Sequence, residues 1–129
     1  MRSSPLFFAA VVALLGCTKS GGGPEALATA FVQAIQNGNY SKAAEMLDWD
    51  GIARQQNPDW DSFPASQRSL IAGKLKEQLQ PQLQQLASRL HGATVTDVSV
   101  TGDVAQARAG GVVLSMKRTE RGWKIASFQ

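Results

Sequence analysis

The sequence predicts an α+β domain in which helices come first and a four-stranded antiparallel sheet comes last. Between residues 24 and 90, apolar residues recur every three or four positions, which is the spacing of amphipathic helices. After Gly92 the period falls to two, β-branched residues become frequent, and short turns separate four runs. Helices grouped before strands are typical of α+β domains rather than of alternating α/β folds.

Three short helices are expected in the first half of the domain. The first begins at Pro24, because proline suits the first turn of a helix, and it ends near Gly38. Asn39 is a candidate N-cap for the second helix, and Asp48 for a third one that ends before Pro58. The apolar face of the first helix consists of Leu27, Phe31, Ala34 and Ile35.

A longer helix is predicted from Pro64 to His91, where one apolar residue follows another at steps of three or four. Pro81 lies inside this pattern, where it removes one amide donor and crowds the carbonyl four residues earlier. We therefore expect either a kink or two helices that meet; the glutamines around Pro81 lie mostly off the apolar face, which favours one bent helix. The periodic residues are Ile71, Leu75, Leu79, Leu83, Leu86 and Leu90.

Four strands follow, over residues 94–101, 104–109, 112–118 and 123–128. The turns between them contain glycine and are only two or a few residues long. Short connections of this kind join antiparallel neighbours, so the sequence predicts a meander. One face of this sheet is expected to pack on the long helix.

The N-terminal segment has the composition of a secretory signal peptide. Arg2 precedes an unbroken apolar run over residues 6–15, and the small Gly16 follows it. As a helix, this run spans only about 15 Å, roughly half of a bilayer core, so it is too short for a stable transmembrane helix. Cys17 comes next and is the only cysteine in the chain, so it has no disulfide partner within the chain.

Residues 14–17, with the sequence Leu-Leu-Gly-Cys, resemble the lipobox of bacterial lipoproteins. The resemblance implies cleavage before Cys17, a diacylglyceryl thioether on its sulfur, and acylation of the new amino terminus by a chain such as palmitate. The alternative is that the signal peptide stays uncleaved or is cut elsewhere by the ordinary signal peptidase. A catalytic thiol is disfavoured, because Cys17 lies between the apolar run and a glycine-rich stretch.

These features divide the chain into three parts. Residues 1–16 are the predicted signal peptide, residues 17–23 are the lipidated cysteine and a flexible tether, and residues 24–129 form a single α+β domain. The expected location is the bacterial cell envelope. In lipoproteins an aspartate after the cysteine favours the inner membrane, so Thr18 favours the outer membrane if the source is a diderm.

The mature domain also resembles a family. The resemblance lies in three pieces: an N-terminal helix that ends in AIQNGNYSKAAEML (residues 34–47), a long amphipathic helix, and a meander that ends in the strand around residues 120–125. This order of elements resembles that of small envelope lipoproteins with a nuclear-transport-factor-2-like, cystatin-like cone. The resemblance implies a cone-shaped domain. That fold hosts enzymes and binding proteins alike, so it implies no particular activity.

Residues 48–64 hold the best candidates for a site. Two Asp-Trp-Asp triplets place carboxylates beside indole rings, and with Tyr40 they suggest a pocket for an apolar ligand. The structural alternative is that each aspartate caps or ends a short helix while each tryptophan is buried. The spacing matches no calcium loop, and no metal, cofactor or catalytic motif is found. The candidate pocket residues are Tyr40, Asp48, Trp49, Asp50 and Trp60.

Charge and motifs leave two classes of function. The 13 basic residues against 10 acidic ones are scattered, which does not predict nucleic-acid binding, and the only histidine, His91, lies at a helix end, where a capping role is expected. The leading hypothesis is a non-catalytic, lipid-anchored module that binds an envelope protein or a small apolar ligand. The alternative is a small cone-fold enzyme that uses Asp48 or Asp50 as a base near Trp49 and Tyr40.

Overall fold

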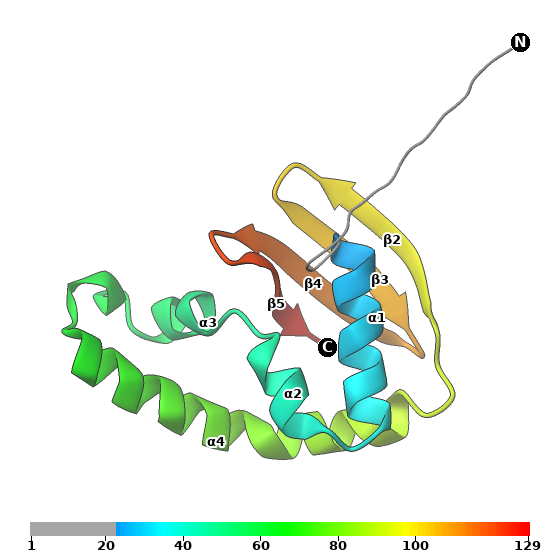
Figure 1. Ribbon diagram of the computed structural model, residues 1–129, viewed down its shortest axis with the longest axis horizontal. Coiled ribbons are helices and arrows are strands. Elements are labelled where there is room, and N and C mark those ends of the chain that lie inside the picture. Colours follow the sequence, from blue (N-terminus) through cyan, green and yellow to red (C-terminus); the bar gives the residue numbers. More distant parts are fainter. Residues whose placement is uncertain (1–22) are drawn as a thin grey trace, which may run out of the picture.

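The computed structural model describes residues 23–129, and the predicted signal peptide and Cys17 lie outside the described residues. Helices come first and strands last, which confirms the predicted α+β class (Figure 1). The helical elements are α1 (Pro24–Gln36), α2 (Tyr40–Glu45), α3 (Trp49–Gln56), the 3₁₀ helix η3 (Trp60–Ser62) and α4 (Ala65–Arg89). The strands are β2 (Val95–Thr101), β3 (Val104–Ala109), β4 (Val112–Thr119) and β5 (Gly122–Phe128).

The predicted helix starts are confirmed by their caps. Pro24 occupies the first turn of α1. The Asn39 side chain accepts a hydrogen bond from the Lys42 amide at 3.3 Å, and the Asp48 carboxylate accepts one from the Gly51 amide at 3.2 Å. Each contact satisfies an amide that the helix itself leaves without a partner. At position 51 a Cβ would collide with the capping carboxylate, so glycine is the residue that fits there.

α4 is one continuous helix that contains Pro81, so the bent-helix alternative is the one observed. In Figure 1 the helix curves along its length beneath the other elements. The predicted apolar stripe is confirmed, since Leu75, Leu83 and Leu86 are buried within α4 and Leu90 is buried just after it. The C-terminal half of the helix joins the main core, whereas the N-terminal half packs against α3 and η3.

The four strands form an antiparallel meander in the order β2-β3-β4-β5. One face of the sheet is buried, and α1 lies across it in contact with β2, β3 and β5. The inward side chains of β3 are all alanines, which leave room for a helix to lie close. The buried face consists of Ala105, Ala107, Ala109, Val112, Leu114, Met116 and Ile125.

The two edges of the sheet differ. At β5, the segment after α2 adds one further bridge: the Ile125 amide donates to the Met46 carbonyl and the Asp48 amide donates to the Ile125 carbonyl, both at 2.8 Å. At β2, no further strand pairs with the edge among residues 23–129. The register of β2 shifts between Thr96 and Ser99, and Asp97 has a positive φ of 55° at this bulge.

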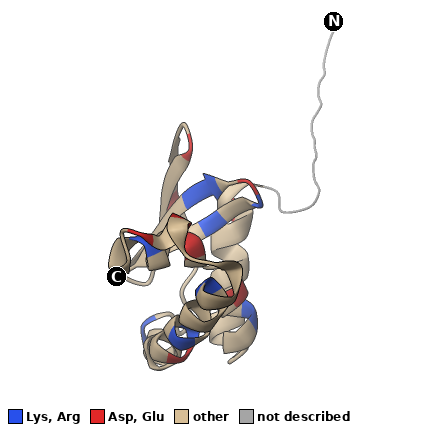
Figure 2. Cartoon of the chain, turned by 90° about the vertical axis from the view of Figure 1, so that its left-hand side faces the viewer, with Lys and Arg blue, Asp and Glu red and all other residues tan. Residues whose placement is uncertain are grey.

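Charged residues are interspersed over the domain. In the view of Figure 2, basic and acidic segments alternate along the strands and helices. Two ion pairs join neighbouring elements, Arg54 with Asp61 and Arg118 with Asp103.

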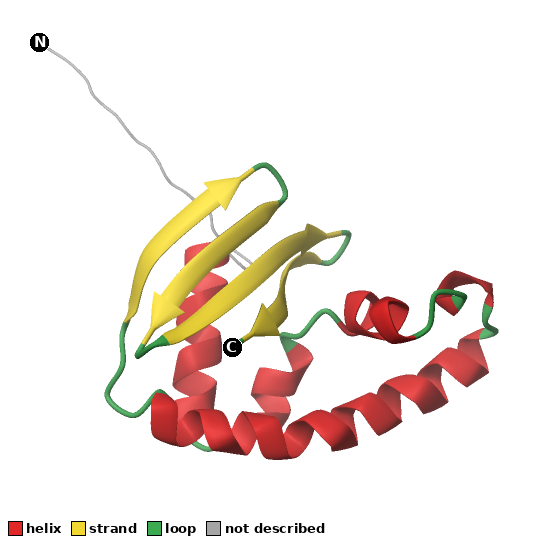
Figure 3. Ribbon diagram, turned by 180° about the vertical axis from the view of Figure 1, so that it is seen from behind, coloured by secondary structure: helices red, strands yellow, loops and turns green. Residues whose placement is uncertain are grey.

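A second, smaller core lies away from the sheet. We call α3, η3 and the N-terminal half of α4 (residues 49–76) the arm, because Figure 3 shows these segments extending beyond the sheet. Its centre is formed by Ala53, Trp60 and Leu75, all at most 4% exposed. Half-buried Trp49, Ile52, Phe63 and Ile71 surround this centre.

Candidate functional site

Asp48 and Trp49 connect the arm to the rest of the domain. Asp48 is 9% exposed and caps α3, while its backbone amide bonds to β5. The Trp49 indole donates to the Ala44 carbonyl at 2.8 Å, and the Lys76 ammonium lies 5.8 Å from the centre of the ring. The Trp49 side chain therefore links α3 to α2 and α4, while Asp48 caps α3 with its side chain and joins β5 through its backbone.

Asp50 and Trp60 hold the arm together. Trp60 is 2% exposed, and its indole N–H donates to the Asp50 carboxylate at 3.2 Å. The Trp60 ring also meets Phe63 edge to face, with centroids 6.1 Å apart. A buried indole N–H needs an acceptor, and Asp50 supplies it.

Asp61, the last residue of the second Asp-Trp-Asp triplet, forms an ion pair with Arg54 on the surface. Arg54 donates to both oxygens of Asp61, at 2.9 and 3.2 Å, and so joins α3 to η3. The hydrogen bond from Arg54, followed by its charge, lowers the pKa of Asp61 below its ordinary value. Both side chains are exposed, so the pair contributes little to stability.

The structure thus brings Trp49, Asp50 and Trp60 into one region, but as packing and hydrogen-bonding partners. Tyr40 packs instead against the main core, at the start of α2. None of these residues lines either of the two principal hollows of the described part. Within residues 23–129, no group of three or more His, Cys, Asp or Glu side chains is arranged to hold a metal ion.

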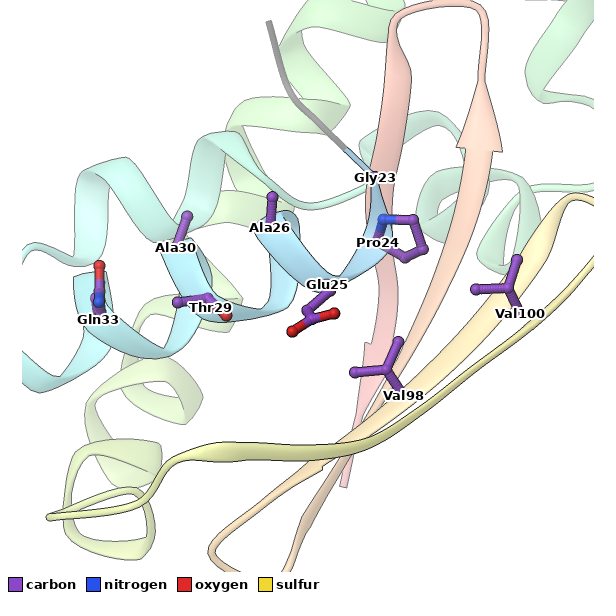
Figure 4. A pocket seen from close by; sticks show the side chains of 9 residues that line it. All are labelled: Gly23, Pro24, Glu25, Ala26, Thr29, Ala30, Gln33, Val98 and Val100. Atoms are coloured by element: carbon purple, nitrogen blue, oxygen red, sulfur yellow. The ribbon is translucent and has the colours of Figure 1, made fainter. Parts of the chain in front are cut away.

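The larger hollow lies elsewhere, between α1 and the edge strand β2 (Figure 4). It is an open groove of about 730 Å³ that begins at the first described residue. Its one charged side chain is Glu25, at the start of α1. The groove is lined by Gly23, Pro24, Glu25, Ala26, Thr29, Ala30, Gln33, Val98 and Val100.

The bulge in β2 creates the apolar wall of this groove. Val95 pairs with Ala109 and Val100 pairs with Ala105, so five steps along β2 match four along β3. The extra residue at the bulge changes which side chains face inward. As a result Val98 and Val100, rather than Asp97 and Ser99, lie on the side of the sheet that carries α1. The sequence pattern alone does not show this change, because a regular strand would place Asp97 on the same face as Val95.

The second hollow, of about 440 Å³, lies where α4 ends. The Gln36 amide group donates to the carbonyls of Leu90 and Ala93, at 2.7 and 2.9 Å. His91 lines the same hollow but follows the helix end. The side chain that bonds the carbonyls at this end is therefore Gln36 from α1, a long-range contact that the sequence does not predict.

Comparison with protein-family models, with curated proteins and with solved structures finds no match to this chain. Among the helices of residues 23–129, none has the length and apolar character that a membrane crossing requires.

Proposed function

We propose that the protein is a lipoprotein of the bacterial cell envelope, anchored through lipid on Cys17, and that its domain is a non-catalytic binding module. The Leu-Leu-Gly-Cys pattern after a short apolar run supports the anchor. The resemblance to small envelope lipoproteins with a cone fold is part of the same proposal, and the α+β architecture is compatible with it.

The observation that carries the binding role is the groove between α1 and β2. Binding sites for small molecules are concave and mostly apolar, with few polar groups. Here proline, alanine and valine side chains form most of the lining, and Glu25, Thr29 and Gln33 supply the polar groups. Of a protein partner and a small apolar ligand, the groove favours the small apolar ligand.

The enzymatic alternative is less well supported. A general base needs a carboxylate that is free to take a proton from a substrate. Asp48 already accepts a hydrogen bond from the Gly51 amide, and Asp50 accepts one from Trp60. Neither residue lines one of the two principal hollows.

The anchor is tested by the variant Cys17→Ser, expressed as the full chain in a diderm host. Without the thiol, no thioether forms, so the variant should leave the membrane fraction, whereas the wild-type chain should stay there after a high-salt wash. A Cys17→Ser chain that stays in the membrane and is processed like the wild type would refute the anchor.

The groove is tested on the Cys17→Ser chain, which lacks a lipid that would itself take up an apolar dye. Binding of the neutral dye N-phenyl-1-naphthylamine is followed by its fluorescence. Ala26 is exposed and lines the groove, so Ala26→Gln should obstruct the groove without unfolding the domain and weaken binding about tenfold, which corresponds to about 1.4 kcal/mol.

The matched control is Ala65→Gln, an equal change at an exposed alanine in the first turn of α4, far from the groove in sequence. It should bind the dye like its parent. Equal dye affinity in the two glutamine variants would mean that the groove is not the binding site, although the anchor could still hold.

A further inference from the structure

The tip of the β2–β3 hairpin exposes two valines. Val100 and Val104 are each 53% exposed, and only Leu70, at 71%, joins them as a strongly exposed large apolar residue among residues 23–129. The two valines flank the turn that joins the strands. Figure 1 shows this turn at the same end of the domain as the start of α1 and the β4–β5 turn.

The two valines point to opposite faces of the sheet. Val100 pairs with the buried Ala105, so it lies on the face that carries α1. Val104 is the neighbour of Ala105 along β3 and pairs with the exposed Lys117, so it lies on the outer face. A partner that docks on one face covers one valine. A fluid surface into which the tip dips covers both.

The charges around the tip also suit a lipid surface. The carboxylate of Asp103, in the turn itself, is bound by Arg118, whose Nε donates at 2.9 Å. Arg118 also lies 5.8 Å from the centre of the half-buried Trp123 ring, and Lys117 stands beside Val104. Glu25 and Glu120 are the acidic groups near this end, and neither forms an ion pair within residues 23–129. Arg118 thus neutralises the one acid in the tip, and Lys117 adds a cation beside it that an anionic headgroup can approach.

The length of the tether brings this end of the domain to the membrane. Five residues separate Cys17 from Gly23, so the chain between them reaches at most about 20 Å. Gly23 lines the groove together with Val98 and Val100. The lipid on Cys17, if the anchor is as proposed above, therefore holds the β2 edge close to the bilayer.

We propose that the β2–β3 tip is a second membrane contact, with Val100 and Val104 inserted among the lipid headgroups. This inference rests on the proposed lipid anchor. It fixes the orientation of the domain, with the open groove at the bilayer surface. The groove then receives its apolar ligand from the membrane side.

The test uses the lipidated full chain in vesicles of phosphatidylcholine and phosphatidylglycerol. Because lipid occupies the sulfur of Cys17, a cysteine introduced by Val100→Cys, Val104→Cys or Leu70→Cys is the only free thiol. Each is labelled with bimane, and quenching by lipids that carry a spin label near the headgroup is measured. We expect at least twofold stronger quenching at positions 100 and 104 than at position 70, which lies in the arm and is the most exposed of the three.

Other results would contradict insertion of the β2–β3 tip into the membrane. Equal quenching at the three positions would overturn the inference and leave the anchor standing. Quenching at position 100 alone would show that lipid meets only the face that carries α1, which overturns insertion of the tip. Dimers in detergent that protect the label without vesicles would identify a second copy as the occupant. Labelling of the wild-type chain at Cys17 would refute the anchor, and the inference with it.

Discussion

The contact between the end of α4 and the β3–β4 turn gives the sharpest test of the fold. Gly110 and Gly111 form this turn, and both have positive φ, of 53° and 83°. A Cβ at position 110 would lie 2.7 Å from the Arg89 carbonyl oxygen and 2.9 Å from the Ala93 Cβ. A Cβ at position 111 would meet nothing within 4 Å. Alanine at position 111 therefore introduces backbone strain alone, whereas alanine at position 110 introduces both strain and a steric clash.

The expected magnitudes follow from these two terms. An alanine at positive φ costs about 1–2 kcal/mol, and the loss of unfolded-state freedom returns about 0.4–1 kcal/mol. Gly111→Ala should therefore lower the free energy of unfolding by no more than about 2 kcal/mol. Gly110→Ala carries the same strain and must also displace a backbone carbonyl, which adds about 1–3 kcal/mol.

Urea unfolding of the Cys17→Ser chain, followed by far-UV circular dichroism, measures both variants. For a domain of about 100 residues, 1 kcal/mol corresponds to about 4–8 °C in Tm, so the two alanine variants should differ clearly by heating as well. Equal destabilisation by the two substitutions would show that α4 does not end against this turn, and the reasoning about the main core would fail with it.

Three further predictions concern the arm and the long helix. Asp50→Ala should cost about 1–3 kcal/mol in urea unfolding, because it orphans the Trp60 indole N–H, whereas Asp50→Asn keeps an acceptor and should stay close to the wild type; equal losses would refute this role. Because the pKa of Asp61 is lowered, the stabilisation from its pairing with Arg54 is present above the ordinary value of 3.8 and is lost as pH falls through the lowered pKa. Asp61→Asn should therefore flatten the pH dependence of stability in that acid range and change stability little at neutral pH. Pro81→Ala restores a helix donor and should raise the free energy of unfolding, by less than the roughly 3 kcal/mol intrinsic penalty of proline, so Tm should rise as well. A lower Tm would show that the bend itself is needed.

The local pattern of the sequence predicts the elements well, because the signals are short-range. The capping side chains of Asn39 and Asp48 lie within three residues of the amides they bond. The leucine spacing of α4 marks the residues that become buried, whichever core they enter. The glycine turns of the meander likewise mark where each strand ends, to within a residue or two.

The arrangement of the elements is less accessible, because it depends on contacts between distant residues. The long helix was expected on the sheet, and its C-terminal leucines do join the main core, but α1 is the helix that lies across the strands. The N-terminal half of α4 instead supports the arm. Apolar residues recur every three or four positions on both sides of Pro81, so the sequence does not show that one stripe serves two cores.

The candidate site illustrates the same limit. Carboxylates and indoles attract attention in a sequence because their chemistry is distinctive, yet Asp48, Asp50 and Trp60 are engaged with one another or with the backbone of the arm. The groove is instead lined by alanine and valine, which carry no chemical signal of their own. Val98 and Val100 belong to it only because a bulge turns them toward α1. A binding surface of this kind is defined by where ordinary apolar residues are left uncovered, and that follows from the register of one edge strand.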